Sequence, residues 1–298
     1  FMKAMNTSKL FTFLVIISLV FVIIRFTKNP DRSNSYNEVL VDFDSQLVDK
    51  IKIENENEQV ILEKISGQWK VKVGQKQHEA VKSTVEAFLQ TIQTIKPSRL
   101  ASRSVERWAD YNVDDKGTRV IISGDKDVFL NIILGRFAFE GQRTYYSFVR
   151  LVDDNDTYVA DNFMKMSLVS QRDDFRNNRV SNFRNDSLTA IDFIYPDSAF
   201  SLIKKEIYWF KNNVEVDSIK FKKYHDDVQF IMSKSFASSD STSVPSHEVI
   251  FHFSNRSEIK ITGSLDQGGW LIRSSENKDE AWKDPVLLEK IFISNKYF

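Results

Sequence analysis

The chain has 298 residues, of which 42% are hydrophobic and 28% are charged, and its formal net charge is zero. This balance is typical of a folded globular body with a sizeable core rather than of a disordered chain. A neutral total argues against a nucleic-acid-binding protein, because phosphate binding usually needs an excess of basic residues. The absence of cysteine excludes disulfides, thiolate nucleophiles and cysteine-ligated zinc, and nine glycines leave little material for phosphate-binding loops.

The most apolar run of the chain is LFTFLVIISLVFVII at residues 10–24, which carries no charge and is closed by Lys9 and Arg25. A helix over this run is shorter than the roughly 30 Å hydrocarbon core of a bilayer. Both flanking cations can snorkel to the interface, so residues 5–27 can span a locally thinned bilayer. We therefore expect a single transmembrane helix within residues 1–26. Its membrane-anchoring residues would be Leu10, Phe13, Leu14, Ile17, Phe21 and Ile24.

A cleaved secretory signal is the alternative interpretation of this run, because the apolar region of such a signal has about the same length. A signal peptide is normally followed by small residues at its cleavage site. Here the run is followed by RFTKNP at residues 25–30, which offers no such site and favours an uncleaved anchor. Short N-terminal tails usually stay in the cytoplasm, so we expect the rest of the chain on the opposite side of the membrane, after a polar linker at residues 27–48.

The remainder of the chain contains the same pattern of strands and one helix twice. KIKIE (50–54) and QVILEKI (59–65) alternate apolar and polar residues, as half-buried strands do, and Trp69 follows in a third strand. Apolar residues at helical spacing predict a helix over 78–95 and a second one over 216–233. Five pairs of residues lie 140 positions apart, namely Ile51 and Ile191, Ile53 and Phe193, Val60 and Phe200, Leu62 and Leu202, and Trp69 and Trp209. Such a match indicates an internal duplication.

We therefore predict an α+β fold made of two tandem repeats, each an antiparallel sheet with a helix packed on one face. The first repeat would cover residues 49–182 and the second 183–298, with the join near 176–188. The residues on the apolar sides of the two helices are Val81, Val85, Phe88, Leu89, Ile92 and Ile95 in the first, and Ile219, Tyr224, Val228 and Ile231 in the second.

Two groups of residues resemble metal sites, but each has a simpler structural explanation. His247 and His252 are five positions apart, whereas metalloprotease helices need two histidines four apart. In a strand, an odd separation places the two rings on opposite faces. DDND at residues 153–156 resembles the start of a calcium loop, but Tyr158 and Met164 stand where that loop needs Gly and Glu. A solvated hairpin turn explains this run more simply.

Other candidates for chemistry are equally well explained by structure. Asp173 and Asp174 lie beside several arginines and could do acid–base work if one carboxyl were buried, but mixed charges are more typical of a solvated connector. Gly-Gly-Trp at 268–270 is typical of a hairpin. Trp69 and Trp209 could stack on a sugar, although their equivalent positions favour the core. Without a P-loop, nucleophile elbow or dinucleotide fingerprint, we predict no catalytic residue, no cofactor and no metal site.

The order of these features resembles a family of uncharacterised, membrane-anchored proteins from bacteria with two membranes. The resemblance covers essentially the whole chain, although Tyr-Asn-Val at 111–113 stands where the family usually has a Tyr-Gly-Leu-like step. It rests on the apolar start, DKIKIENENEQVILEKISGQWKV (49–71), the helix at 78–95, ERWADYNVDD (106–115), FLNIILG (129–135), YYSFVRLVDDNDTYVAD (145–161) and DDFRNNRVSNF (173–183). Members are commonly encoded beside ABC-transporter genes, including those related to gliding-motility transporters. The resemblance implies a periplasmic body on an inner-membrane anchor, near a transport or envelope machine, and it implies no reaction.

Together these observations lead us to expect a non-enzymatic accessory subunit of an envelope transport complex of the ABC type. Its partners would be the lipid bilayer and integral membrane subunits of a transporter or secretion complex, and not nucleic acid. The alternative is an extracytoplasmic binding module for a glycan, a lipid or a secreted polypeptide, with Tyr145, Tyr146 and Trp270 as contacts in a cleft between the two halves. A third hypothesis, an envelope hydrolase, would need converging polar groups such as Asp173 and His225.

Overall fold

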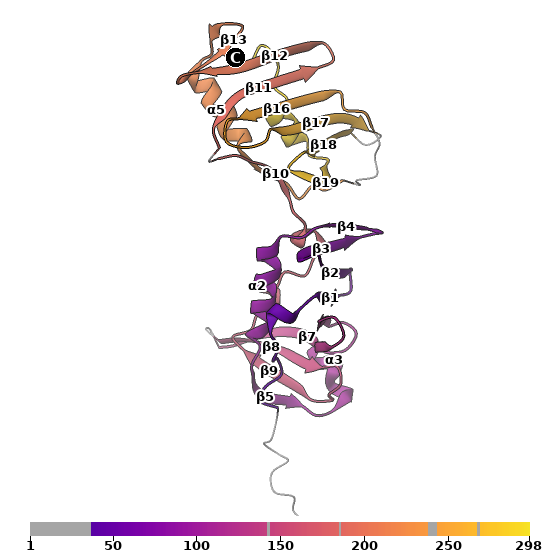
Figure 1. Cartoon of the computed structure of the whole chain (residues 1–298). Helices are drawn as coiled ribbons and strands as arrows, with labels where there is room; N and C mark the ends of the chain where they lie inside the picture. Colours follow the sequence, from indigo (N-terminus) through magenta and orange to yellow (C-terminus); the bar gives the residue numbers. More distant parts are fainter. Residues whose placement is uncertain (1–36, 142–143, 185, 238–242, 267–268) are drawn as a thin grey trace, which may run out of the picture.

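The computed structural model describes residues 37–141, 144–184, 186–237, 243–266 and 269–298, which form two lobes stacked end to end (Figure 1). The described chain begins at the end of the first lobe that lies away from the second (Figure 1). Within these ranges, no helix is long and apolar enough to cross a membrane. The predicted anchor at residues 1–26 lies outside the described part of the chain and stays a prediction.

The first lobe is built on a nine-stranded antiparallel sheet in the order β4-β3-β2-β1-β6-β7-β8-β9-β5. Its strands are β1 (Lys50–Glu54), β2 (Gln59–Ile65), β3 (Gln68–Val73), β4 (Lys76–Glu79), β5 (Pro97–Ser102), β6 (Thr118–Ser123), β7 (Val128–Glu140), β8 (Thr144–Leu151) and β9 (Thr157–Asp161). Helix α2 (Lys82–Gln93) packs on one face of this sheet. The short turns of helix are η1 (Ser45–Leu47), η2 (Val105–Arg107), α3 (Trp108–Tyr111), η3 (Lys165–Ser167) and α4 (Arg172–Phe175).

The second lobe is built on an eight-stranded antiparallel sheet in the order β14-β13-β12-β11-β16-β17-β18-β19. Its strands are β11 (Leu188–Tyr195), β12 (Ser198–Lys205), β13 (Tyr208–Lys211), β14 (Val214–Glu215), β16 (His247–Phe253), β17 (Ile259–Asp266), β18 (Gly269–Ser274) and β19 (Asn277–Trp282). Helices α5 (Ser218–Val228) and α6 (Pro285–Ile291) contribute to its core. Strands β10 (Arg179–Asn182) and β15 (Phe230–Met232) form a small separate sheet.

The two large sheets have corresponding strand orders and the same register. Ile51 pairs with Leu62 in the first sheet, and Ile191 pairs with Leu202 in the second, which is a shift of 140 positions for both residues. The same shift relates the pair Lys64 and Trp69 to the pair Lys204 and Trp209. Alternating apolar residues produce this register because each sheet buries one face against its helix. The predicted antiparallel, sheet-rich fold with few helices is confirmed.

Both predicted helices are shorter in the structure. His78 belongs to β4, which pairs with β3, so the first helix begins at Lys82 instead of residue 78. The second helix was predicted over 216–233, but Asp217 caps it by accepting a hydrogen bond from the backbone N–H of Ile219 at 2.8 Å. The helix ends at Val228 instead of residue 233, because residues 230–232 form strand β15, which pairs with β10.

Ile219 was placed on the apolar side of its helix, and this prediction is wrong. The side chain is 80% exposed, whereas Tyr224 and Val228 are buried. Ile219 precedes Tyr224 by five positions, which is about 140° around the helix axis at 3.6 residues per turn. The two side chains therefore cannot share one face.

Each lobe has its own hydrophobic core. Trp69 lies in the first core, as predicted, whereas the equivalent Trp209 is half-buried and stacks on Phe221 at 4.2 Å beside the second core. Val180 and Phe183 pack in the second core, so the chain enters the second lobe by Val180.

Candidate functional site

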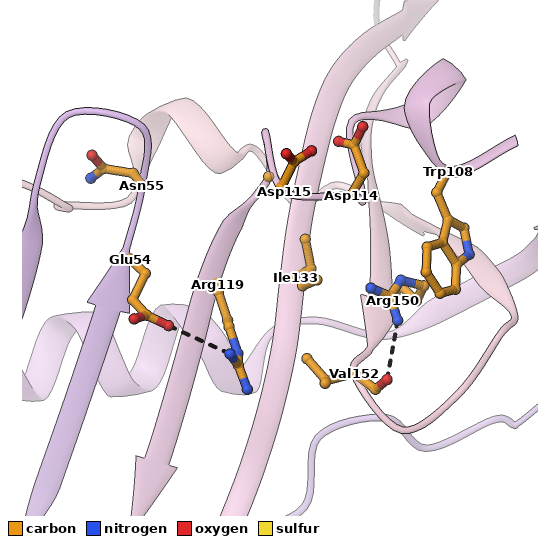
Figure 2. Close-up of a pocket in the computed structure, with 10 residues that line it drawn as sticks. Glu54, Asn55, Trp108, Asp114, Asp115, Arg119, Ile133, Arg150 and Val152 are labelled. Carbon is orange, nitrogen blue, oxygen red and sulfur yellow. Dashed lines mark hydrogen bonds and ion pairs between the residues drawn. The ribbon is translucent and has the colours of Figure 1, made fainter. Parts of the chain in front are cut away.

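A cavity of about 370 Å³ opens on the face of the first sheet opposite α2 (Figure 2). Strand alternation explains this placement, because Ile132 of β7 points into the core and its neighbour Ile133 points to the opposite face. Strands β1, β6 and β8 contribute Glu54, Arg119 and Arg150 to the same cavity (Figure 2). The site is therefore assembled from three consecutive strands, β6, β7 and β8, together with β1 from much earlier in the chain.

The segment that contains α3 closes one side of the cavity. Tyr111 and Val113 pack with Ile133 in a small core of their own. Between them, Asn112 ends α3 in the left-handed conformation that Asn tolerates, with φ 52° and ψ 39°. The close approach of this segment to the sheet requires glycine at position 117, where a Cβ atom would lie 2.3 Å from Ile133 Cγ2.

Arg150 is a buried cation in the wall of the cavity. Its guanidinium lies 3.7 Å from the centroid of the Trp108 ring, and its Nε donates to the carbonyl oxygen of Val113 at 3.0 Å. Its Nη1 donates to the carbonyl oxygens of Leu151, Val152 and Asp154. Burial lowers the pKa of Arg150. The side chain ties the α3 segment to the turn after β8 and so maintains the shape of the cavity.

Charged groups of both signs form the rim. Arg119 Nη1 lies 3.7 Å from Glu54 Oε2, and a hydrogen bond from Lys52 lowers the pKa of Glu54, so Glu54 stays a carboxylate at neutral pH. Asp114 and Asp115 lie on the α3 side of the rim (Figure 2). The described lining contains no Ser, Thr, Lys or His side chain that could serve as nucleophile or neutral base. Its chemistry suits binding of a small polar group that carries both charges.

A second cluster of ionisable groups is buried where the two lobes meet. Arg176, in the connection between the lobes, donates from Nε and Nη2 to the two carboxylate oxygens of Glu280 in β19. Its Nη1 donates to Asp173 at 2.9 Å, and its guanidinium lies 3.7 Å from the centroid of the Phe236 ring. Burial alone would lower the pKa of Arg176, but the hydrogen bonds to Glu280 and Asp173 outweigh burial and raise the pKa.

His78 brings the first sheet to this junction. Its Nδ1 lies 3.1 Å from Glu280 Oε1, yet the direction of approach does not fit a hydrogen bond, and this buried nitrogen has no hydrogen-bond partner. Two surface ion pairs also connect the lobes, Lys70 with Asp279 at 3.7 Å and Lys234 with Asp174 at 2.5 Å. The junction thus combines a desolvated centre with a solvated border.

Exposed apolar side chains gather at the end of the second lobe that lies away from the first, around β12, β13, β14 and the start of α5 (Figure 1). We call this set the distal tip, and its members are Ile203, Ile207, Tyr208, Val214 and Ile219. A groove of about 380 Å³ lies at the distal tip, lined in part by Ile207, Tyr208, Phe221 and Lys204.

The two histidines of β16 do not meet. His247 packs against the rings of Tyr195 and Trp270, whereas His252 Nε2 lies 2.8 Å from a carboxylate oxygen of Asp192. The alternation of β16, which buries Val249 and Phe251, places the two rings on opposite faces, as predicted. Among the residues that the structure describes, no group of three or more His, Asp or Glu is placed to hold a metal ion.

Asp173 and His225, the candidates for a hydrolase, have different surroundings. Asp173 binds Arg176 at the junction, whereas His225 in α5 packs on the rings of Phe183 and Phe221. Burial lowers the pKa of His225, and the neighbouring Asp226 offsets part of that effect. The structure therefore does not assemble these two side chains into one site.

The aromatic candidates for ligand contact lie in different lobes. Tyr145 and Tyr146 belong to β8 of the first lobe, and Trp270 belongs to β18 of the second. All three are half-buried, and Arg99 lies 5.2 Å from the centroid of the Tyr146 ring. These rings do not form a single strip.

The two predicted hairpins are present. Residues 153–156 lie in the turn between β8 and β9, where Asp154 accepts a hydrogen bond from the Tyr158 hydroxyl at 2.8 Å. Burial, together with Asp154, raises the pKa of Tyr158. Asp266 pairs with Gly269 where β17 turns into β18. The first of these turns also supports the cavity, because Arg150 donates to the carbonyl oxygen of Asp154 and Trp108 Nε1 donates to that of Asn155.

A family described as "Domain of unknown function (DUF4340)" matches residues 75–248, which is more than half of the chain. The chain belongs to this family. The DUF4340 match begins just before β4 and ends in β16, so it includes the α3 segment, Arg150 and Arg176 but not Glu280. No curated protein and no solved structure matches the chain. The resemblance to an uncharacterised family is confirmed, and the neighbourhood of transporter genes stays an expectation.

Sequence analysis missed the buried junction of this DUF4340 chain. Arg176 and Glu280 are 104 positions apart, and Arg176 stands in a run of mixed charge that is typical of solvated connectors. Glu280 directly precedes the buried Ala281 and Trp282, which is a weak sign that it too is buried. Trp108 and Arg150 were likewise missed, because only the folded α3 segment brings them together.

Proposed function

We propose that this chain is a non-enzymatic accessory subunit of an envelope transport complex of the ABC type. In this proposal, residues 1–26 tether it to the inner membrane and its body lies in the periplasm. The body is a tandem duplication, with one copy in each lobe, and it acts as a spacer between the tether and a partner subunit.

The buried junction carries this proposal. Arg176 and Glu280 are 5% and 1% exposed, so a hinge motion that opened the lobes would break two hydrogen bonds and expose a matched ion pair. The two lobes are therefore held as one body, with the first described residues at one end and the distal tip at the other (Figure 1). A rigid body of this kind suits a subunit that holds a partner at a fixed distance from its tether.

Native co-purification tests the proposal. The tagged full chain would be extracted from membranes of the organism that encodes it in mild detergent, and the associated proteins would be identified and quantified by mass spectrometry. We expect integral membrane subunits of a transporter at a fixed ratio to the chain. Recovery of the chain as a monomer under every native condition tried would contradict the proposal.

The cavity of Figure 2 favours a second function, an extracytoplasmic binding module for a glycan that carries both amino and carboxylate groups. Trp108 offers a ring face in the wall, and Arg119, Asp114 and Asp115 offer charges of both signs. Titration with amino sugars that carry a carboxylate, followed by tryptophan fluorescence, would test it. Saturable binding that Asp115→Asn weakens would support this function, and an unchanged signal at millimolar sugar would contradict it.

A further inference from the structure

One edge of the first sheet is covered by the chain itself. Val81 donates its backbone N–H to the carbonyl oxygen of Phe175 at 2.8 Å, and Asn177 donates its N–H to the carbonyl oxygen of Glu79 at 3.0 Å. Ala80 forms an antiparallel bridge with Arg176 between these two bonds. The connection between the lobes thus adds a short extended segment to the edge just after β4.

The second sheet has an edge strand with the equivalent backbone geometry. Ala80 N–H donates to the Trp69 carbonyl at 2.9 Å, and the equivalent Val216 N–H donates to the Trp209 carbonyl at 2.8 Å. The next residue has nearly the same backbone conformation in both lobes, with φ −69° and ψ 107° at Val81 and φ −53° and ψ 116° at Asp217. Residues 214–217 therefore correspond to residues 78–81.

Among the described residues, no backbone segment pairs with this second edge, although the C-terminal end lies beside β13 (Figure 1), where Lys211 Nζ donates to the carbonyl oxygens of Asn295 and Phe298. Among the backbone hydrogen bonds of the described residues, the Asp217 N–H has no acceptor, although the equivalent Val81 N–H is bonded to Phe175. The Glu215 carbonyl likewise receives no bond like the one from Asn177 to Glu79. An open edge of this kind is a template for pairing with another strand.

Several side chains around the open edge are more apolar than their equivalents in the first lobe. By strand pairing and by the shared hydrogen bonds, each member of the distal tip has an equivalent in the first lobe. The first-lobe equivalents of Ile203, Ile207, Tyr208, Val214 and Ile219 are Glu63, Gly67, Gln68, His78 and Ser83. His78 is 3% exposed at the junction, whereas its equivalent Val214 is 70% exposed. Val214 thus replaces a residue that is buried at the covered edge, and the other four members are apolar where the first lobe has polar residues or glycine that are themselves exposed or half-buried.

We propose that the open edge at residues 214–217 docks an extended, largely apolar segment of a partner protein, which adds to the second sheet as residues 175–177 add to the first. A carbonyl oxygen of the partner segment accepts from the Asp217 N–H, and a backbone N–H of the partner segment donates to the Glu215 carbonyl. The Lys204 side chain lines the adjacent groove and makes no hydrogen bond or ion pair with the residues that the structure describes, so we place a carboxylate of the segment beside it. This inference rests on the proposed function, because it names the surface that the transport partner occupies.

Site-specific photocrosslinking tests the inference. A photoreactive amino acid would replace Ile219 in the full chain, or Val128 of the first lobe as a control that is also mostly exposed, in cells of the organism that encodes it. Asp217→Pro removes the edge N–H at a residue whose φ suits proline, and Asp217→Ala is its matched control, because both variants lose the helix cap and only the first loses the donor. Circular dichroism of both variants would check that they fold.

We expect an adduct with a partner protein from position 219 and none from position 128. Asp217→Pro should lower the adduct yield about fivefold relative to Asp217→Ala, which is the effect of one backbone hydrogen bond. If Asp217→Pro does not fold, Val214→Asp replaces it and should lower the yield about tenfold, because it places an unpaired charge at the edge.

Equal yields in the paired variants, an adduct formed by two copies of this chain, or no adduct at 219 would each overturn the inference. The proposed function would survive each of these results as long as transporter subunits still co-purify with the chain. It fails separately if nothing co-purifies.

Discussion

Replacing Glu280 by alanine tests how strongly the buried junction holds the two lobes together. The carboxylate accepts two hydrogen bonds from Arg176, and both side chains are at least nine-tenths buried. Removal of one partner of a buried pair typically costs about 3–5 kcal/mol, because the other charge is left without compensation. Asp173 would still bind Arg176 from a position that is partly solvated, so we expect about 3 kcal/mol, the low end of that range.

Two further variants test whether the loss comes from leaving a buried charge without its partner. Asp279→Ala removes the neighbouring ion pair with Lys70. The Asp279 side chain is 49% exposed, so this loss should cost less than about 0.5 kcal/mol. The double variant Arg176→Met with Glu280→Leu replaces the pair by apolar groups of similar size. It should recover most of the loss and lie within about 1–2 kcal/mol of the parent, because neither charge is then stranded.

Urea denaturation followed by tryptophan fluorescence and circular dichroism measures these free energies of unfolding. If the junction couples the lobes, the two signals of the parent coincide, and Glu280→Ala separates them into two transitions. The reasoning would be refuted by a cost below about 1 kcal/mol for Glu280→Ala, or by a double variant as unstable as the single one.

Three further predictions concern the cavity and one helix. Arg150→Met should lower the free energy of unfolding by about 2–4 kcal/mol, because it leaves buried carbonyl groups without donors. The same change at the more exposed Arg119 should cost less than about 1 kcal/mol in the same urea denaturation. Gly117→Ala should cost about 1–3 kcal/mol by forcing the α3 segment away from Ile133, and an unchanged melting temperature would contradict this. Burial lowers the pKa of His225 below its unfolded value, so the unfolded state binds more protons as the pH falls. The contribution of His225 to stability is therefore present above about pH 6.5 and is lost as the pH falls through the folded pKa. His225→Gln should therefore flatten the decline of the unfolding free energy between pH 7 and pH 5, and an unchanged slope would show that other groups cause it.

The sheets were predictable from the sequence because their signal is local. Alternation in β1 and β2 fixes which residues face the core, and the shift of 140 positions recurs as strand register in the second lobe. The hairpins between β8 and β9 and between β17 and β18 were predictable for the same reason, since turn residues act over a few positions.

The helix boundaries were not predictable from periodicity alone, whereas the orientation of Ile219 was. His78 fits the spacing of the helix that follows it, yet pairing of β4 with β3 takes precedence. Ile219 lies about 140° around the helix axis from the buried Tyr224, so the helical period by itself places Ile219 toward solvent.

The junction and the open edge were hidden in the sequence because they depend on contacts between residues far apart in the chain. Arg176 is an ordinary connector residue until Glu280 is placed against it by the second lobe. Val214 is an unremarkable strand residue until comparison with His78 shows that the same position is covered in the first lobe and open in the second.

The most direct test of the account is the amount of transporter subunit that co-purifies with the full chain when the open edge is altered. Val214→Asp would be compared with Val128→Asp, since both replace a solvated valine and only the first lies at the distal tip. The account predicts that Val214→Asp loses the partner while Val128→Asp retains it at the parent ratio. Equal recovery from both variants, or no partner with the parent chain, would contradict it.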